Sequence, residues 1–268
     1  MKRDSAEPET TRPSIRKRRA RLKAEQLREK LLTTALEVLD RDGLTLTLAH
    51  LNVEGLIRAT GIPRSSYYRA WPSNELLYLD LIAAMVAPER MDERVPDPGT
   101  TALGYTIIKQ YEDRMGDRDG RRAVLRELIR QTVAYNFDST HESLAWRTHA
   151  ALTAPLSSLS AENHSRAKEI LGEADSRNLK RMADYYTEML ELFKLRLIDG
   201  VDTNALAVNA AALIGGSVIR HVMGRAAPAP LRLPGIDGEL VDWHPAAVGF
   251  LAMVDGMTKL ADEEAEHE

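Results

Sequence analysis

The sequence contains no cysteine, which excludes disulfides and thiolate-ligated metal sites. Aromatic residues make up only 5% of the chain, whereas leucine, alanine, glutamate and arginine abound, a composition that favours helices over sheets. The longest weakly polar run, Ala205 to Ile219, is interrupted by Asn209 and two glycines, so it is too short to span a bilayer. The charged N-terminus lacks the apolar stretch of a secretory signal. These absences predict a cytoplasmic, helical protein with no membrane partner.

The net charge of -4 conceals a basic N-terminal arm. Residues 1–24 contain nine Lys or Arg and three Asp or Glu, a net charge of +6, so the remainder carries -10. A basic arm on an acidic body indicates an anionic partner for the arm, and a solvated, disordered tail is the alternative. We expect Arg16, Arg18, Arg19 and Arg21 to enter the minor groove of DNA and to add affinity with little sequence information.

Two short helices around a tight turn are predicted after a long first helix that ends at Gly43. Asn52 is a good N-cap for the first short helix, 53–59, and it is included among the candidate DNA-binding residues. Gly61 marks the turn, and the second short helix covers 63–70, because proline suits the first helical position. This arrangement is a helix-turn-helix pattern, in which the second helix enters the major groove of DNA.

The predicted recognition helix carries the candidate base and phosphate contacts. Arg64 and Arg69 can pair with guanine or with phosphate. Ser65 and Ser66 leave room for the helix to lie deep in the groove, and their hydroxyls can donate or accept hydrogen bonds. Tyr67 either touches a thymine methyl group or packs inward.

A Trp-Pro pair ends the recognition helix, because proline disfavours helical geometry in the residue before it. Trp71 is predicted to pack in the core and to hold the recognition helix against its neighbours. Ser73 is predicted to cap the next helix, 74–87.

The stretch 28–77 resembles the DNA-binding domain of the tetracycline-repressor (TetR) family of transcriptional regulators. The matching features are the glycine that ends the first helix, the capped second helix, the Gly-apolar turn, two aromatics three residues apart and a Pro-Ser cap, namely Gly43, Asn52, Gly61-Ile62, Tyr68, Trp71 and Pro72-Ser73. The connector after the first helix is longer than usual, and residues differ from the family pattern at Ile57, Pro63 and Asn74. The resemblance implies that Tyr68 donates its phenol to a phosphate and that the protein is a repressor binding a palindromic operator.

The rest of the chain is predicted to be a helical bundle, so the fold class is all-α. Helices are expected at 100–116, 120–137, 141–154, 160–199, 203–224 and 246–262. The proline-rich stretch 226–245 is expected to be an ordered surface excursion or a flexible loop. The predicted units are a disordered basic arm, a helix-turn-helix DNA-binding domain, a helical ligand-binding and dimerisation domain and an acidic tail, at 1–24, 25–72, 73–262 and 263–268.

The stretch 203–224 is rich in small residues and contains Gly215 and Gly216 within a helical pattern. A glycine costs a helix about 1 kcal/mol relative to alanine, so a close approach of another helix would explain the pair. The resemblance implies a homodimer built from the last large helices, here about 160–199 and 203–224, and an intramolecular helix pair is the alternative. A dimer places two recognition helices in successive major grooves.

The resemblance also implies a pocket in the body for a small-molecule effector, whose binding would separate the recognition helices. Tyrosines suit such a pocket because they combine an apolar ring with a polar tip. The candidate lining residues on the mid-body helices are Tyr105, Tyr111, Gln131, Tyr135, Trp146, His149, Tyr185, Tyr186 and Phe193. Ordinary core or surface positions are the alternative for each of them, and the effector itself is not identified.

No enzymatic activity, cofactor, catalytic residue or metal ligand is expected. His141 and His149 lie eight residues apart rather than four, and the Glu264–His267 pair stands in the acidic tail without a second copy. The sequence has no glycine-rich phosphate loop and no nucleophile elbow.

A DNA-binding architectural protein without a ligand is the other alternative. A regulator should instead prefer its own operator over random DNA by ~10³ or more.

Overall fold

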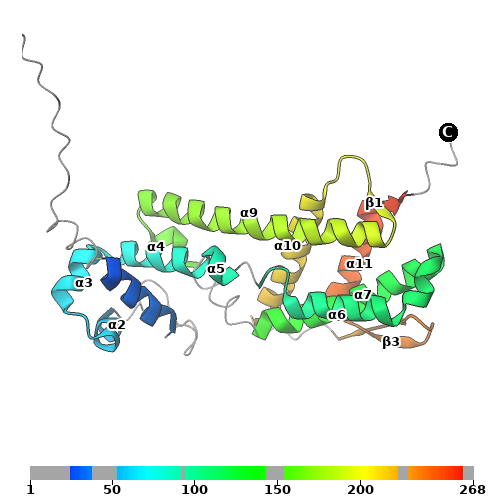
Figure 1. The fold of residues 1–268 in the computed structure, drawn as a ribbon, viewed down its shortest axis with the longest axis horizontal. Coiled ribbons are helices and arrows are strands. Elements are labelled where there is room, and N and C mark those ends of the chain that lie inside the picture. Colours follow the sequence, from blue (N-terminus) through cyan, green and yellow to red (C-terminus); the bar gives the residue numbers. More distant parts are fainter. Residues whose placement is uncertain (1–24, 38–52, 92–93, 143–153, 223–228, 262–268) are drawn as a thin grey trace, which may run out of the picture.

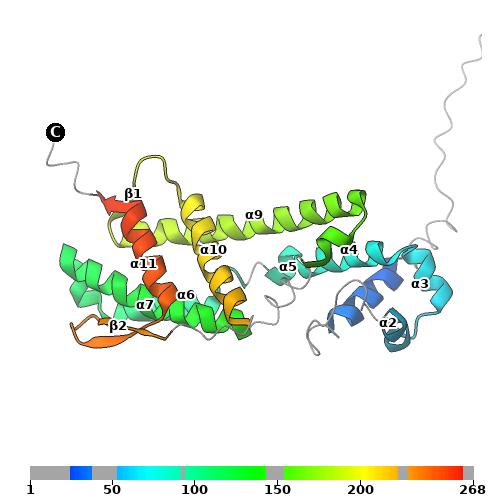
Figure 2. The same ribbon diagram turned by 180° about the vertical axis from the view of Figure 1, so that it is seen from behind.

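The computed structural model describes residues 25–37, 53–91, 94–142, 154–222 and 229–261. The predicted all-α class is confirmed: an N-terminal helix-turn-helix module is followed by a helical bundle (Figures 1 and 2). None of the helices in these ranges is long and apolar enough to cross a membrane.

Four helices build the N-terminal module. They are the helix over 25–37, α2 (Val53–Thr60), α3 (Arg64–Ala70) and α4 (Asn74–Met85). Gly61 connects α2 to α3 with φ of +63°, in the left-handed region that favours glycine. Trp71, directly before a proline, is extended and ends α3 as predicted. Ser73 caps α4, because its side chain accepts a hydrogen bond from the amide of Leu76 at 3.4 Å.

Two aromatic side chains anchor α3 to the core of this module. Tyr67 and Trp71 are both 0% exposed, and their ring centroids lie 5.5 Å apart. The Trp71 indole donates a hydrogen bond to Asp80 Oδ2 of α4 at 2.7 Å. Arg28 of the first helix forms an ion pair with the same carboxylate, and its guanidinium lies 5.5 Å from the centre of the Trp71 ring. The predicted core position of Trp71 is confirmed, and α3 is held in one orientation.

The long helix α9 (Ala161–Leu192) runs from the N-terminal module to the far end of the bundle (Figure 1). Its 32 residues correspond to about 48 Å. Apolar side chains of its first half join the core of the N-terminal module. Glu75 of α4 accepts hydrogen bonds from the amide and hydroxyl of Ser160 at 3.1 and 2.7 Å, and Arg177 donates to the carbonyl of Val86 at 3.0 Å. Hydrogen bonds from α9 and the residue before it therefore hold α4 at both of its ends.

The body is a bundle in which α7 contacts α6 and α11, while α10 contacts α9 and α11. Figure 2 shows α10 and α11 crossing α9 on one side of the molecule. The bounds are α5 (Pro88–Met91), α6 (Pro98–Gln110), η3 (Glu112–Gly116), α7 (Arg118–Glu142), η4 (Ala154–Ser158), α10 (Thr203–Val222) and α11 (Pro245–Met257). The helix predicted over 100–116 is thus a helix followed by a 3₁₀ turn, and most of the one predicted over 141–154 lies outside the described residues.

Two short antiparallel ribbons were not predicted. β1 (Leu195–Leu197) pairs with β4 (Thr258–Leu260), and β2 (Leu231–Pro234) pairs with β3 (Leu240–Trp243). The helices predicted to reach 199 and 262 therefore end early, at Leu192 and Met257. At the first of these ends, Lys194 has φ of +54°, a conformation that an α-helix cannot continue through. The ribbons depend on packing against helices, because isolated two-stranded hairpins are only marginally stable.

Candidate nucleic-acid interface and ligand cavity

The outward face of α3 carries most of the predicted DNA contacts. Arg64, Ser65 and Arg69 are exposed, Tyr68 is 45% exposed, and Ser66 is half-buried. These side chains offer guanidinium and hydroxyl donors on one short helix, which are the groups that base edges and phosphates accept. Arg16, Arg18, Arg19, Arg21 and Asn52 lie outside the described residues.

The guanidinium of Arg64 is held in place before any DNA is bound. It forms an ion pair with Glu54 Oε1 of α2 at 2.8 Å, and it lies 5.7 Å from the centre of the Tyr68 ring. The neighbouring Tyr68 side chain and, after it, the Glu54 carboxylate raise the pKa of Arg64 further above its already high ordinary value. A phosphate would have to compete with Glu54, whereas the hydroxyl of Tyr68 remains on the exposed face.

Tyr67 packs inward, which is one of the two alternatives left open for it, so it does not belong to the DNA-contacting face. Its side chain is 0% exposed, and its hydroxyl is buried with no hydrogen-bond partner among the described residues. Burial, with a smaller effect of Tyr68, raises the pKa of Tyr67 to about 12. Tyr67 lies one residue from Tyr68, and consecutive residues of a helix point about 100° apart, so one ring enters the core while the next faces outward.

A cavity of about 120 Å³ lies in the body among α6, α7, α9, α10 and α11. Most of its wall is apolar. The polar side chains that line it are Asp97, Thr100, Thr101, Thr132, Asn136, Tyr185 and Tyr186. A mostly apolar wall with a few polar points is typical of a small-molecule site. The volume is slightly smaller than that of an engineered cavity that binds benzene, so a ligand of about five to six non-hydrogen atoms fits.

Two of the predicted lining residues, Tyr185 and Tyr186 of α9, line this cavity. Their ring centroids lie 5.9 Å apart, and Tyr186 lies 6.0 Å from Phe250 of α11. Burial, with smaller effects of Tyr105 and Glu188, raises the pKa of Tyr185 to about 12, and burial also raises the pKa of Tyr186. Both hydroxyls therefore stay protonated and can donate hydrogen bonds.

The other described candidates do not line the cavity. Tyr105 is exposed and donates to Glu188 Oε1 at 2.6 Å, and Tyr135 is also exposed on the surface. Phe193 is buried in a neighbouring cluster, which Tyr111 contacts. Gln131 donates to a buried carboxylate of its own helix, as described below. Trp146 and His149 lie outside the described residues.

The cavity is lined instead by residues that the sequence pattern did not single out. Thr132 and Asn136 face the cavity from α7, whereas Gln131 and Tyr135, one position earlier in each turn, do not line it. A helical repeat does not specify which face meets a hollow rather than a packed neighbour. The Asp97–Pro98 pair was a usable signal, because aspartate before proline marks a helix start.

Asp97 is the one charged residue among the described lining residues. Its Oδ2 accepts hydrogen bonds from the amide and hydroxyl of Thr100 at 2.7 and 2.8 Å and caps α6, while Ser139 donates to Oδ1 at 3.3 Å. Asn136 donates to the Thr100 hydroxyl at 3.2 Å. The hydrogen bonds orient the carboxylate but do not cancel its charge, so the cavity disfavours anions.

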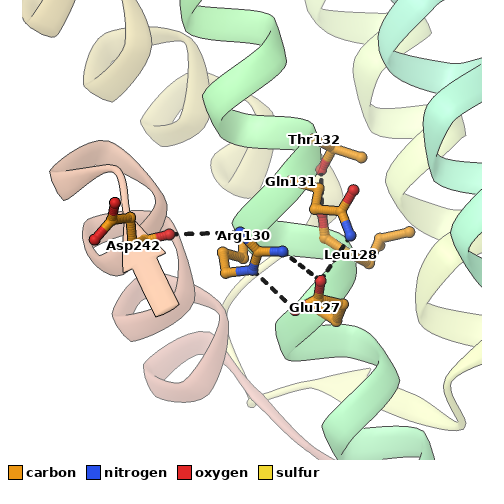
Figure 3. A network of polar contacts seen from close by, with 6 residues as sticks. All are labelled: Glu127, Leu128, Arg130, Gln131, Thr132 and Asp242. Carbon is orange, nitrogen blue, oxygen red and sulfur yellow. Dashed lines mark hydrogen bonds and ion pairs between the residues drawn. The ribbon is translucent and has the colours of Figure 1, made fainter. Parts of the chain in front are cut away.

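A buried polar network fastens α7 to the β2–β3 ribbon (Figure 3). Glu127 is 4% exposed, and its carboxylate accepts hydrogen bonds from Arg130 at 2.9 and 2.5 Å and from Gln131 at 2.6 Å. Arg130 also donates to the carbonyl of Asp242 in β3 at 3.4 Å. Burial raises the pKa of Glu127, but the hydrogen bonds and charge of Arg130 and the hydrogen bond of Gln131 outweigh it, so the pKa is lowered overall.

Glu127→Gln should lower the free energy of unfolding by about 2 kcal/mol near neutral pH, because Arg130 loses a buried charged partner. A lowered folded pKa contributes stability above the unfolded pKa, and this is lost as pH falls through the folded value. The difference in unfolding free energy between wild type and variant should therefore shrink as the pH falls below 4.5, the ordinary pKa of a glutamate. Urea unfolding at several pH values measures it. Glu169→Gln, on an exposed part of α9, is the control, and a difference that persisted undiminished in acid would contradict the assignment.

Two solved structures resemble this chain in the arrangement of their helices. No protein-family model matches the sequence, and no curated protein is similar to it in sequence. The reduced form of E. coli NemR has 15% sequence identity and a TM-score of 0.43, with 87% of this chain and 98% of that chain covered. A Saccharomonospora viridis protein described as a transcriptional regulator, in complex with choline, has 12% identity and a TM-score of 0.46, with 88% and 99% covered. At these values, function rests on the residues of the chain itself.

Proposed function

We propose that the protein is a ligand-responsive transcriptional regulator that binds a palindromic DNA operator as a homodimer. Its action as a repressor is the role that the TetR resemblance implies. The observation that carries the proposal is the division of α3 into two faces. Tyr67 and Trp71 fasten one face in the core, while Arg64, Tyr68 and Arg69 stand on the other. A non-catalytic role is part of the same proposal.

Binding and sensing are connected through α9. Arg177 donates to the carbonyl of Val86 at the end of α4, and one turn later Arg181 donates to the carbonyl of Val95 at 2.8 Å. Val95 is two residues before Asp97, which lines the cavity. A ligand that displaces this wall would therefore act on a segment that α9 connects to α4. The side chains of α4 share one core with Tyr67 and Trp71 of α3, so a shift of α4 would reach the recognition helix.

The homodimer is proposed to form through the exposed face of α10. Val208 and Ile219 are 43% and 48% exposed, and they lie eleven residues apart, which places them on the same side of the helix. Gly215 and Gly216 lie between them, and a methyl group added to either would meet nothing within 4 Å among the described residues. Packing within one subunit therefore does not explain the glycines, whereas a second copy would. A role of 160–199 in the interface stays a prediction.

The two adjacent tyrosines of α3 provide a matched test of DNA binding. Tyr68→Phe removes an exposed hydroxyl and should weaken operator binding about tenfold, because a hydrogen bond to a charged phosphate is lost. Tyr67→Phe removes a buried hydroxyl and should leave binding within about twofold of wild type. The measurement is fluorescence anisotropy with an operator selected from random DNA. Equal effects of the two substitutions would contradict the proposed face.

The same assay separates a regulator from an architectural protein. Arg64→Gln and Arg69→Gln should each lower the salt slope of binding by about one where the arginine contacts a phosphate. The wild type should prefer the selected operator over random DNA by ~10³ or more. A preference near unity would favour an architectural role and overturn the proposal.

The effector is proposed to be small and to carry no negative charge, because Asp97 supplies the one charge in the described cavity wall. Tetramethylammonium, tert-butanol and pivalate have similar shapes and differ in charge. Calorimetry should show the cation bound most tightly and the anion least. Asp97→Asn keeps the helix cap and should reduce the preference for cation over alcohol about tenfold. A preference for pivalate, in wild type or variant, would contradict this.

A further inference from the structure

A second cavity, of about 250 Å³, is lined by residues of α7, β1 and β4. Figure 1 shows β1 at the end of the body far from α3. Arg118, Arg121 and Arg122 line it from the first turns of α7, and Lys259 lines it from β4. Asp255 is the acidic residue among the described lining residues. The remaining wall includes four apolar side chains, Leu125, Phe193, Leu195 and Leu260. The cavity is therefore positively charged in a protein whose net charge is -4.

The three arginines stand where helix electrostatics disfavours them. Positions 118, 121 and 122 are spaced i, i+3 and i+4, so their side chains share one face of α7, and like charges at this spacing repel. The N-terminus of a helix also carries the positive end of its dipole. Acidic groups offset part of this charge: Arg122 pairs with the exposed Asp255 at 3.7 Å, Lys259 pairs with Asp199 at 3.4 Å, and Asp117 caps the helix by accepting from the Gly120 amide at 2.8 Å. A bound anion would offset this repulsion.

The side chain of Arg121 is a second observation, separate from the helix end, that points to a bound anion. It is 8% exposed, and its Nη1 donates to the carbonyls of Met115 and Gly116 at 3.4 Å each, which is long for a hydrogen bond. Its Nε is buried with no hydrogen-bond partner among the described residues. A buried guanidinium with an unused donor is costly, and its planar fork matches the two oxygens of a carboxylate or phosphate.

We propose that this cavity binds an amphipathic oxyanion. The carboxylate or phosphate head would lie against Arg118, Arg121 and Arg122 at the N-terminus of α7, where helix amides and dipole favour negative charge. The apolar body would lie against Phe193 and Leu260. By proportion to the benzene-sized cavity, the volume admits about ten non-hydrogen atoms. The site is distinct in charge from the effector cavity, with which it shares the side chains of Leu125 and Leu195.

Titration calorimetry of the full chain with octanoate, octyl phosphate and octan-1-ol tests the proposal. Octanoate, octyl phosphate or both should bind at least tenfold more tightly than the neutral alcohol, and the tighter anion identifies the head group. Arg118 and Arg122 are exposed, so the double variant Arg118→Gln/Arg122→Gln should fold. It should lose at least tenfold in anion affinity with octanol binding unchanged. Arg121→Met should behave in the same way.

The matched control is Arg166→Gln, which removes one exposed arginine from the first half of α9 and should leave every affinity within twofold. Two results would overturn the proposal. One is equal affinity for the alcohol and both anions in the wild type. The other is anion binding that survives in the Arg118→Gln/Arg122→Gln variant, which would place the anion elsewhere on the protein. Because glutamine is a good helix former, the double variant should keep its helicity, and circular dichroism separates loss of folding from loss of binding.

Discussion

Val208→Glu/Ile219→Glu is expected to convert the protein into monomers and to weaken operator binding about a thousandfold. Both side chains are largely exposed apolar groups on one face of α10. Across a two-fold axis the glutamates would meet their own copies, so charge is buried and repelled. A monomer binds each half-site alone and loses the effective concentration that a linked pair provides, which is worth about 10² to 10⁴ in affinity. Light scattering reports the mass, and anisotropy reports DNA binding.

The control for this variant changes the same chemistry on another surface. Leu231 and Leu240 are also exposed, and they lie in the β2–β3 ribbon. Leu231→Glu/Leu240→Glu adds the same charge and should leave mass and DNA binding unchanged. Two outcomes would contradict the proposed α10 interface. One is a wild-type protein that is monomeric at the concentrations of the DNA assay, and the other is a Val208→Glu/Ile219→Glu variant that stays dimeric.

Trp71→Ala should lower the free energy of unfolding by about 4 kcal/mol and abolish operator binding. A fully buried tryptophan replaced by alanine leaves a large cavity, and such substitutions typically cost about 3–5 kcal/mol. Here the substitution also removes the indole that packs on Tyr67 and donates to Asp80 at 2.7 Å. Because Trp71 holds α3 in place, DNA binding should fall with stability. Urea unfolding followed by circular dichroism measures the first effect, and anisotropy measures the second.

Trp71→Phe is the matched variant, since it keeps most of the ring volume and loses the hydrogen bond to Asp80. We expect it to cost about 1–2 kcal/mol and to retain measurable DNA binding. If Trp71→Ala were as stable as Trp71→Phe, or bound the operator as the wild type does, α3 would not depend on this anchor.

Local chemistry made the N-terminal module predictable. Gly61 permits the left-handed turn, the Trp71–Pro72 pair stops α3 and Ser73 caps α4, and each of these effects acts within a few residues. The outward position of Arg64, Ser65, Tyr68 and Arg69 was predicted together with the helix. Tyr67 was not settled, because α3 is too short for periodicity to separate an aromatic core residue from an aromatic contact.

The candidate cavity was predictable only in part. Tyr185 and Tyr186 were found by residue type, yet the same criterion selected Tyr105 and Tyr135, which are exposed. Residue type does not reveal which side of a helix borders a hollow. The small polar side chains that line it, such as Thr132, carry no signal by themselves, since threonine is common on helix surfaces as well.

The sequence by itself determined the helical class, the helix-turn-helix boundaries and the charged face of α3, because these depend on backbone preferences and caps that neighbouring residues set. Tertiary structure decided which aromatic is buried, where α9 ends and which side chains meet around Asp97 and Arg121. Those outcomes depend on contacts between residues far apart in the chain. No local propensity encodes such contacts.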